Sequence, residues 1–131
     1  MIFFIKLVMS KKILVIEDEP IILLSILNLL ERNGYLALSA DNGEIGIQLA
    51  RQENPDLIIC NMAMPRVTGY EVIRELRNYP NTTMIPFIVI TAQGTPVEIE
   101  QWQELGVNNY LLKPYNSDEL LRKIGEILNQ G

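Results

Sequence analysis

The sequence has no histidine and a single cysteine, Cys60, among its 131 residues. The missing histidine excludes Ser/His/Asp and Cys/His catalysis, the common zinc sites and a phosphohistidine, so any histidine needed for phosphoryl transfer must come from another protein. Because Cys60 has no second cysteine to pair with, a disulfide framework and a thiolate metal cluster are excluded as well. One unpaired cysteine fits the reducing cytoplasm, where we expect the protein to work.

Basic residues are also few, with 11 Lys and Arg against 16 Asp and Glu and a net charge of -5. Because they are scattered along the sequence, we expect no direct binding to nucleic acid. The apolar run 1–8 is far shorter than a membrane span and lacks a small-residue cleavage site. We interpret residues 1–9 as an N-terminal extension outside the core fold, with an added edge strand or a membrane tether as alternatives. Residues 10–131 then form one domain.

Short apolar runs rich in β-branched residues alternate with amphipathic stretches from Lys12 onward. The runs are residues 13–16, 35–39, 57–60, 87–90 and 109–112. This alternation is typical of βαβ units, which place helices on both faces of a parallel sheet. We therefore predict a doubly wound α/β fold with five strands and five helices.

Several predicted helices carry signals at their ends. Thr95 is a candidate N-cap whose capping box Glu98 completes, for a helix that should end at Gly106. Asn42 and Ser117 are the predicted caps of the second and fifth helices.

The first helix, predicted over residues 20–33, has more apolar residues than one buried face requires. The buried face is predicted to consist of Leu23, Ile26, Leu27 and Leu30. The further apolar residues are Ile21, Ile22 and Leu29. We expect neighbouring loops to bury these, with contact to a partner helix as the alternative.

Polar residues follow four of the five predicted strands. The first strand leads into Glu17 and Asp18, the third into Asn61, the fourth into Thr91 and the fifth into Lys113. Ligands of open parallel α/β sheets bind at the carboxyl ends of the strands. Oxygen ligands for Mg²⁺, a hydroxyl and a cation at one crevice would suit metal-assisted phosphoryl transfer, although the nucleophile is missing. Each of these residues alone would be interpreted as a solvated loop residue or a cap. Their occurrence together at four strand ends favours a phosphoryl-transfer site.

Five segments in register resemble bacterial response-regulator receiver domains. Residues 13–20 (ILVIEDEP) resemble the opening of the family, and 55–65 (PDLIICNMAMP) its third strand and phosphorylation loop, with Gly69 after it. Residues 89–92 (VITA) and 110–115 (YLLKPY) resemble its fourth and fifth strand ends. The resemblance covers residues 12–128. It implies a flavodoxin-like sheet of order 2-1-3-4-5 and a signalling role in a bacterial two-component phosphorelay, without enzymatic activity.

The resemblance also implies roles for individual residues. Glu17 and Asp18 would form the acidic pocket, the Ala63 backbone carbonyl and Asn61 would complete the Mg²⁺ ligands, and Lys113 would contact the phosphoryl group.

Further implications of the resemblance concern the switch and the partners. Thr91 and Tyr110 would be the switch pair, and the bond from Lys113 to Pro114 would be cis. The expected partners are a histidine kinase or histidine phosphotransfer protein, a downstream protein at the face of the fourth helix and fifth strand, and a second copy in a homodimer.

The sequence departs from the family at Asn61, where the family pattern has the phosphate-accepting aspartate. A neutral amide does not attack phosphorus, and the lost negative charge should weaken Mg²⁺ binding. Both an engineered aspartate-to-asparagine change and a natural receiver that signals without phosphate fit the sequence.

Other functions remain alternatives at this point. A phosphorylation-independent scaffold would bind partners through the first helix or through the surface carrying Trp102 and Tyr110, with Trp102 partly buried. A phosphatase would need a nucleophilic aspartate where the chain has Asn61. A flavin protein would need a phosphate-binding loop after the first strand, where the acidic residues would repel a phosphate.

Overall fold

The structure is a computed structural model that describes residues 10–129, and the predicted N-terminal extension lies outside them. Within these residues five strands alternate with five helices. The elements are β1 Lys12–Ile16, α2 Pro20–Arg32, β2 Leu36–Ala40, α3 Gly43–Glu53, β3 Leu57–Asn61, α4 Gly69–Leu76, β4 Phe87–Thr91, α5 Pro96–Glu104, β5 Asn109–Leu112 and α6 Ser117–Leu128.

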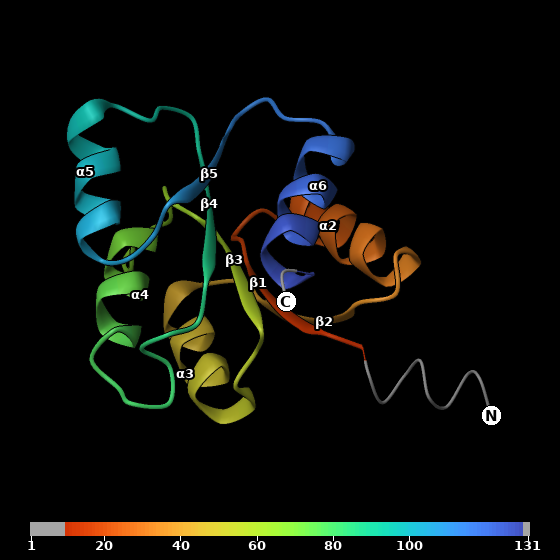
Figure 1. Cartoon of the computed structure of the whole chain (residues 1–131), viewed down its shortest axis with the longest axis horizontal. Coiled ribbons are helices and arrows are strands. Elements are labelled where there is room, and N and C mark those ends of the chain that lie inside the picture. The colour runs from red at the N-terminus through yellow and green to blue at the C-terminus, as the bar shows by residue number, and fades with distance from the viewer. Residues whose placement is uncertain (1–9, 130–131) are drawn as a thin grey trace.

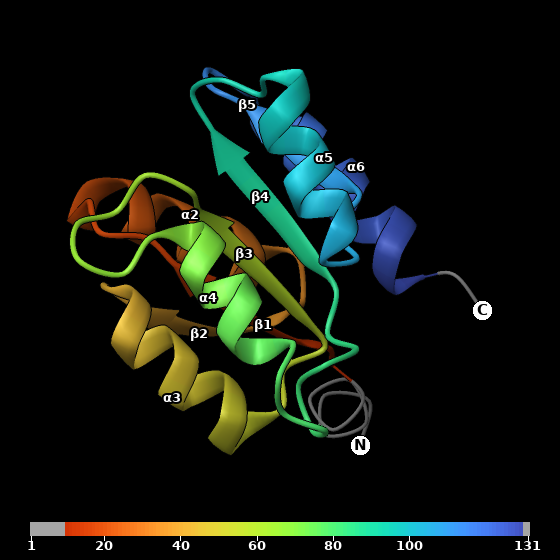
Figure 2. The same ribbon diagram turned by 90° about the vertical axis from the view of Figure 1, so that its left-hand side faces the viewer.

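The five strands form one parallel sheet in the order β2-β1-β3-β4-β5, which confirms the predicted fold. Helices α2 and α6 lie on one face of the sheet, and α3, α4 and α5 lie on the other (Figure 1). Figure 2 shows the second face with its three helices in front of the strands. Because parallel strands end together, the carboxyl ends of β1, β3 and β4 meet at one edge.

Alternate side chains of the central strands supply two separate cores, as the period of a strand requires. Ile13 and Val15 pack with α2 and α6, whereas Leu14 and Ile16 pack with the helices of the other face. Trp102 of α5 belongs to this second core and is only 2% exposed, so the predicted partial burial is wrong. It therefore cannot form part of a docking surface, which removes one of the two surfaces that the scaffold alternative offered and leaves the first helix.

The predicted element ends are correct to within about two residues. Helix α2 ends one residue earlier than expected, and α5 ends before Leu105, with Gly106 following at a φ of 77°. The predicted cap Ser117 is wrong, because it is the first residue of α6. Asn116 is the cap instead, and its side chain accepts a hydrogen bond of 2.8 Å from the Glu119 N–H.

Helix α2 buries its predicted face, but one of its extra apolar residues is not covered. Ile26 and Leu30 are buried and Leu23 packs beside them. Ile21 is 85% exposed, which contradicts its predicted burial beneath loops. The helix therefore presents an apolar side chain to the solvent at its first turn.

Thr95 and Glu98 form the predicted capping box at the start of α5. The Thr95 hydroxyl accepts a hydrogen bond of 3.2 Å from the Glu98 N–H, and the Glu98 carboxylate accepts one of 3.3 Å from the Thr95 N–H. We expect Thr95→Ala to lower the free energy of unfolding by about 1 kcal/mol in urea denaturation. Thr95→Ser keeps the acceptor and should lose much less. Equal losses in both variants would contradict the capping role.

Candidate functional site

The predicted polar residues that follow β1 and β5 converge on Asn61. Asn61 is the last residue of β3 and is 4% exposed, and Glu17, which follows β1, is 1% exposed. β1 and β3 are neighbours in register, with Ile16 beside Cys60, so Glu17 and Asn61 continue two adjacent strands. The sequence prediction that these side chains meet at one edge of the sheet is confirmed.

One amide group links the members of this pocket. The Asn61 Nδ2 donates hydrogen bonds to Glu17 Oε2 and Asp18 Oδ1, both at 3.2 Å, and to the Ala63 carbonyl at 3.3 Å. Its Oδ1 accepts a hydrogen bond of 3.1 Å from the Lys113 Nζ. Asn61 therefore lies between the acidic side of the pocket and its single ammonium group.

Glu17 is the most deeply placed acidic group of the pocket. Its Oε2 also accepts a hydrogen bond of 3.1 Å from the Glu19 N–H, whereas its buried Oε1 has no hydrogen-bond partner. Burial raises the pKa of this carboxyl above its usual value, against the opposing effect of the Glu19 hydrogen bond. A buried carboxylate oxygen without a partner is unusual in proteins and favours a cation or water in this pocket.

The acceptors present are of the kind that Mg²⁺ prefers, because Glu17, Asp18 and the Ala63 carbonyl are all hard oxygen ligands. No cluster of three or more acidic, histidine or cysteine side chains suited to a metal occurs among residues 10–129. Asn61 supplies an amide where a third carboxylate would complete such a cluster. Its Nδ2 also contacts each of the three oxygens, so the ligand set fits a cation only after the amide has turned away.

The two predicted switch residues, Thr91 and Tyr110, lie on the neighbouring strands β4 and β5. Among residues 10–129, neither side chain forms a hydrogen bond with Asn61. The Thr91 hydroxyl donates a hydrogen bond of 2.8 Å to the Gln93 carbonyl within its own loop. The half-buried Tyr110 ring packs against Trp102, with 5.8 Å between ring centroids. The bond between Lys113 and Pro114 is cis, as the resemblance implied.

Gly69, at the start of α4, supports the pocket in a way that the sequence analysis missed. Its N–H donates a hydrogen bond of 2.9 Å to the Met62 carbonyl. A Cβ at this position would lie 2.6 Å from the Asn61 carbonyl oxygen and 2.8 Å from the Met62 Cα. Only glycine therefore lets the helix pack this closely against the end of β3.

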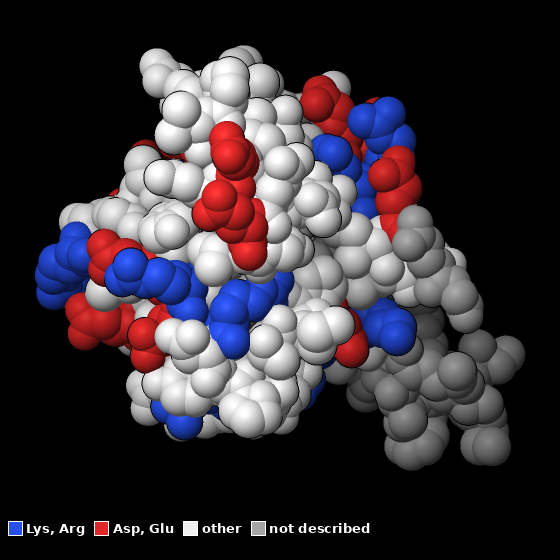
Figure 3. Space-filling view, turned by 60° about the vertical axis from the view of Figure 1, so that its left-hand side comes forward, with Lys and Arg blue, Asp and Glu red and all other residues white. Residues whose placement is uncertain are grey.

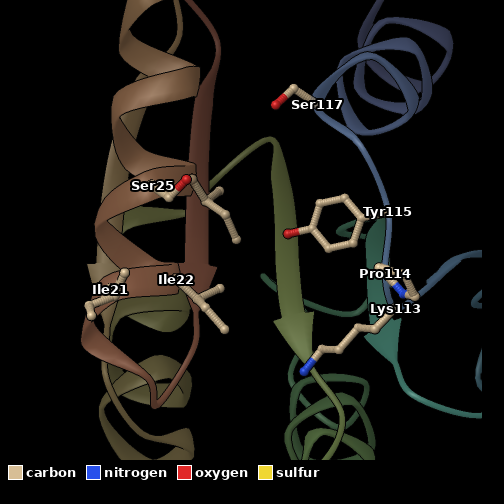
Figure 4. A pocket seen from close by; sticks show the side chains of 8 residues that line it. Ile21, Ile22, Ser25, Lys113, Pro114, Tyr115 and Ser117 are labelled. Atoms are coloured by element: carbon tan, nitrogen blue, oxygen red, sulfur yellow. The ribbon is translucent and has the colours of Figure 1, made fainter.

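A groove of about 420 Å³ lies beside the pocket, and its aromatic residue, Tyr115, had no predicted role. It is lined by the first turns of α2 and by the segment after β5, including Ile21, Ile22 and Tyr115. Figure 4 shows the Tyr115 hydroxyl pointing toward α2, and the Lys113 ammonium near the tip of β3. Burial, and secondarily the Glu17 charge, raise the pKa of Tyr115.

The surface gives no sign of a polyanion-binding face in the orientation of Figure 3. Basic side chains there lie interleaved with acidic ones, as expected from the scattered Lys and Arg residues. Within the described part of the chain, no helix is both long enough and apolar enough to cross a membrane.

Comparison with known proteins assigns the family. The response regulator receiver domain profile matches residues 13–125. PilH of Pseudomonas aeruginosa is 32% identical over 117 residues, which cover 89% of this chain and 97% of PilH. The transcriptional regulatory protein PhoP of Bacillus subtilis is 34% identical over 93% of this chain, but the match spans only 50% of PhoP. The chain belongs to the response regulator receiver domain family of two-component signalling.

Solved structures agree with this assignment. The chemotaxis protein CheY4 of Vibrio cholerae superimposes with a TM-score of 0.86 at 25% identity, covering 91% of this chain and 99% of CheY4. The receiver domain of a Pseudomonas aeruginosa sensor histidine kinase has a TM-score of 0.83 at 28% identity, covering 92% of this chain and 99% of that domain. That second structure has a magnesium ion coordinated in its active-site cleft.

Proposed function

We propose that Asn61 stands at the phosphoacceptor position and that this chain is a receiver that takes up no phosphoryl group as it stands. The observation that carries the proposal is the convergence of Glu17, Asp18 and Lys113 on the Asn61 side chain at the end of β3. A carboxylate at this place would be aimed between an acidic pocket and an ammonium. The amide has no negative charge and is a poor nucleophile, so the chemical step lacks its acceptor.

The same proposal assigns weak Mg²⁺ binding to this pocket. Glu17, Asp18 and the Ala63 carbonyl would hold the ion, and the Asn61 amide oxygen, which now faces Lys113, could join them only after the side chain had turned over. A bound Mg²⁺ neutralises phosphoryl oxygens during transfer. With one carboxylate fewer than the family pattern, the pocket attracts the ion less strongly.

The partners follow from the family, and the chain itself acts as a docking protein rather than an enzyme. A histidine kinase or histidine phosphotransfer protein would dock beside Lys113, in the cytoplasm of a bacterium. The exposed Val97 of α5 and Leu112 of β5 mark a surface for a downstream protein or a second copy of the chain. Thr91 and Tyr110 would be the switch pair that links the pocket to this surface, and without phosphoryl transfer they would stay in one arrangement.

Acetyl phosphate and Mg²⁺ test the proposal, with intact-mass analysis as the measurement. We expect Asn61→Asp to gain about 80 Da, the mass of one phosphoryl group, and the unchanged chain to gain nothing. In the variant a carboxylate oxygen forms the bond to phosphorus and acetate leaves. Asn61→Ala is the matched control, because it changes the same position without supplying a nucleophile. A mass gain in the unchanged chain would contradict the proposal.

A phosphorylation-independent scaffold is the second candidate function. The observation that favours it is Ile21, which is 85% exposed and lines the groove at the start of α2. An exposed apolar side chain of this kind suits a partner that stays bound whether or not the receiver is phosphorylated. If Asn61→Asp also gains no mass, the pocket is inactive even with a carboxylate, and the scaffold function replaces the non-phosphorylated switch.

A further inference from the structure

The nitrogen of the Asn61 amide reaches the same three oxygens that the proposed function assigns to the metal ion. Its distances to Glu17 Oε2, Asp18 Oδ1 and the Ala63 carbonyl are 3.2, 3.2 and 3.3 Å. An amide NH₂ carries two partly positive hydrogens, which can satisfy converging acceptors as a cation does. We propose that the Asn61 amide takes the place of the metal ion in this pocket and competes with it. The inference rests on the proposed function, because it takes these three oxygens as the metal ligands.

The orientation of the amide follows from its surroundings. Lys113 has only donors on its ammonium group, and this group contacts Oδ1 at 3.1 Å. The opposite orientation would place Oδ1 against the Glu17 and Asp18 carboxylates and the NH₂ against the ammonium, so all four favourable contacts would become repulsive. A metal ion at the acidic side must therefore break the whole arrangement or push the side chain out of the pocket.

This arrangement predicts an effect opposite to that of simple ligand loss. If Asn61 were merely a weak ligand, its removal would weaken Mg²⁺ binding further. If its NH₂ competes with the ion, removal should strengthen binding, because Mg²⁺ readily keeps a water molecule in place of one protein ligand. Substitution of Asn61 by alanine therefore separates the two accounts by the sign of the change.

The experiment is a calorimetric Mg²⁺ titration of the full chain and its Asn61→Ala, Asn61→Ser and Asn61→Asp variants. We expect Asn61→Ala to bind Mg²⁺ about tenfold more tightly than the unchanged chain, the equivalent of about one net hydrogen bond. Asn61→Ser, with one donor hydrogen in place of two, should also bind more tightly and serves if the alanine variant does not fold. The comparison is repeated with Lys113→Met, which removes the ammonium that could otherwise move onto the carboxylates.

Either result decides the inference. Tighter binding after loss of the amide, in either background, supports competition. Equal or weaker binding in both backgrounds overturns it. Asn61→Asp reports separately on the proposed function: if this variant binds Mg²⁺ and gains the phosphoryl group while alanine brings no increase, the competition is wrong and the proposed function stands.

Discussion

Asn61→Asp is expected to unfold at a temperature about 10 °C lower than the unchanged chain in metal-free buffer, a loss of about 3 kcal/mol. The substitution replaces the Nδ2 that now lies 3.2 Å from Glu17 Oε2 and from Asp18 Oδ1. A carboxylate oxygen in its place would lose the contacts to three oxygens, which share the two amide hydrogens, and would face two like charges in a buried site. Lys113 can compensate only part of this, because its ammonium already contacts the other side-chain atom of residue 61.

Mg²⁺ should restore most of the stability that Asn61→Asp loses, and it should alter the melting temperature of the unchanged chain little. The ion would bind the folded state only, so its contribution grows with concentration above its dissociation constant. Thermal unfolding followed by circular dichroism, with and without millimolar MgCl₂, measures both effects. In metal-free buffer Asn61→Ala is the matched control, because it removes the same hydrogen bonds without adding a charge. Equal melting temperatures for Asn61→Asp with and without the ion would contradict the argument.

The sequence predicted the strands and most helix starts because these depend on local signals, whereas the strand order was implied by the resemblance to receiver domains. The continuous apolar runs indicated buried parallel strands, and the Thr95 capping box marked α5 from four residues alone. Asn116 and Ser117 show where this approach reaches its limit. Both residue types can cap a helix, and only the extended backbone of Asn116, with a ψ of 165°, shows which one does.

The composition of the pocket was predictable, whereas the use of its atoms was not. Glu17, Asp18, Asn61 and Lys113 could be predicted as pocket residues because each follows an apolar run that was recognised as a strand. That one amide nitrogen contacts three oxygens from two separate segments depends on distances that no local pattern contains. The burial of Trp102 is a similar case, since its contact with Tyr110 joins a helix to the following strand.

Gly69→Ala is expected to lower the free energy of unfolding by about 3 kcal/mol, the upper part of the range for overpacking a close contact. The added Cβ would meet the Asn61 carbonyl oxygen at 2.6 Å and the Met62 Cα at 2.8 Å. Both are backbone atoms at the end of a central strand, so neither can move aside as a flexible side chain would. Helix α4 must then shift away from β3, and the Gly69 to Met62 hydrogen bond lengthens with it.

Gly125→Ala is the matched control for this prediction, because the same substitution there has the opposite sign. Gly125 lies within α6, and its added Cβ would meet only the Asn129 side-chain nitrogen, at 3.4 Å. Alanine at a helix interior should therefore stabilise the protein by up to about 1 kcal/mol. Urea denaturation of both variants measures the difference. A Gly69→Ala variant as stable as the unchanged chain would contradict the prediction, because it would show that the backbone at Asn61 and Met62 can move to make room for the Cβ.

The strain at Gly69 should also reach the pocket, because the carbonyl that meets the new Cβ belongs to Asn61 itself. In the Asn61→Asp background, Gly69→Ala should therefore slow phosphorylation by acetyl phosphate, whereas Gly125→Ala should not. The rate of the mass gain at a temperature where both double variants are folded measures this effect. A slower rate in the Gly69 variant would show that its close approach sets the position of the acceptor residue, and an unchanged rate would restrict Gly69 to a role in packing.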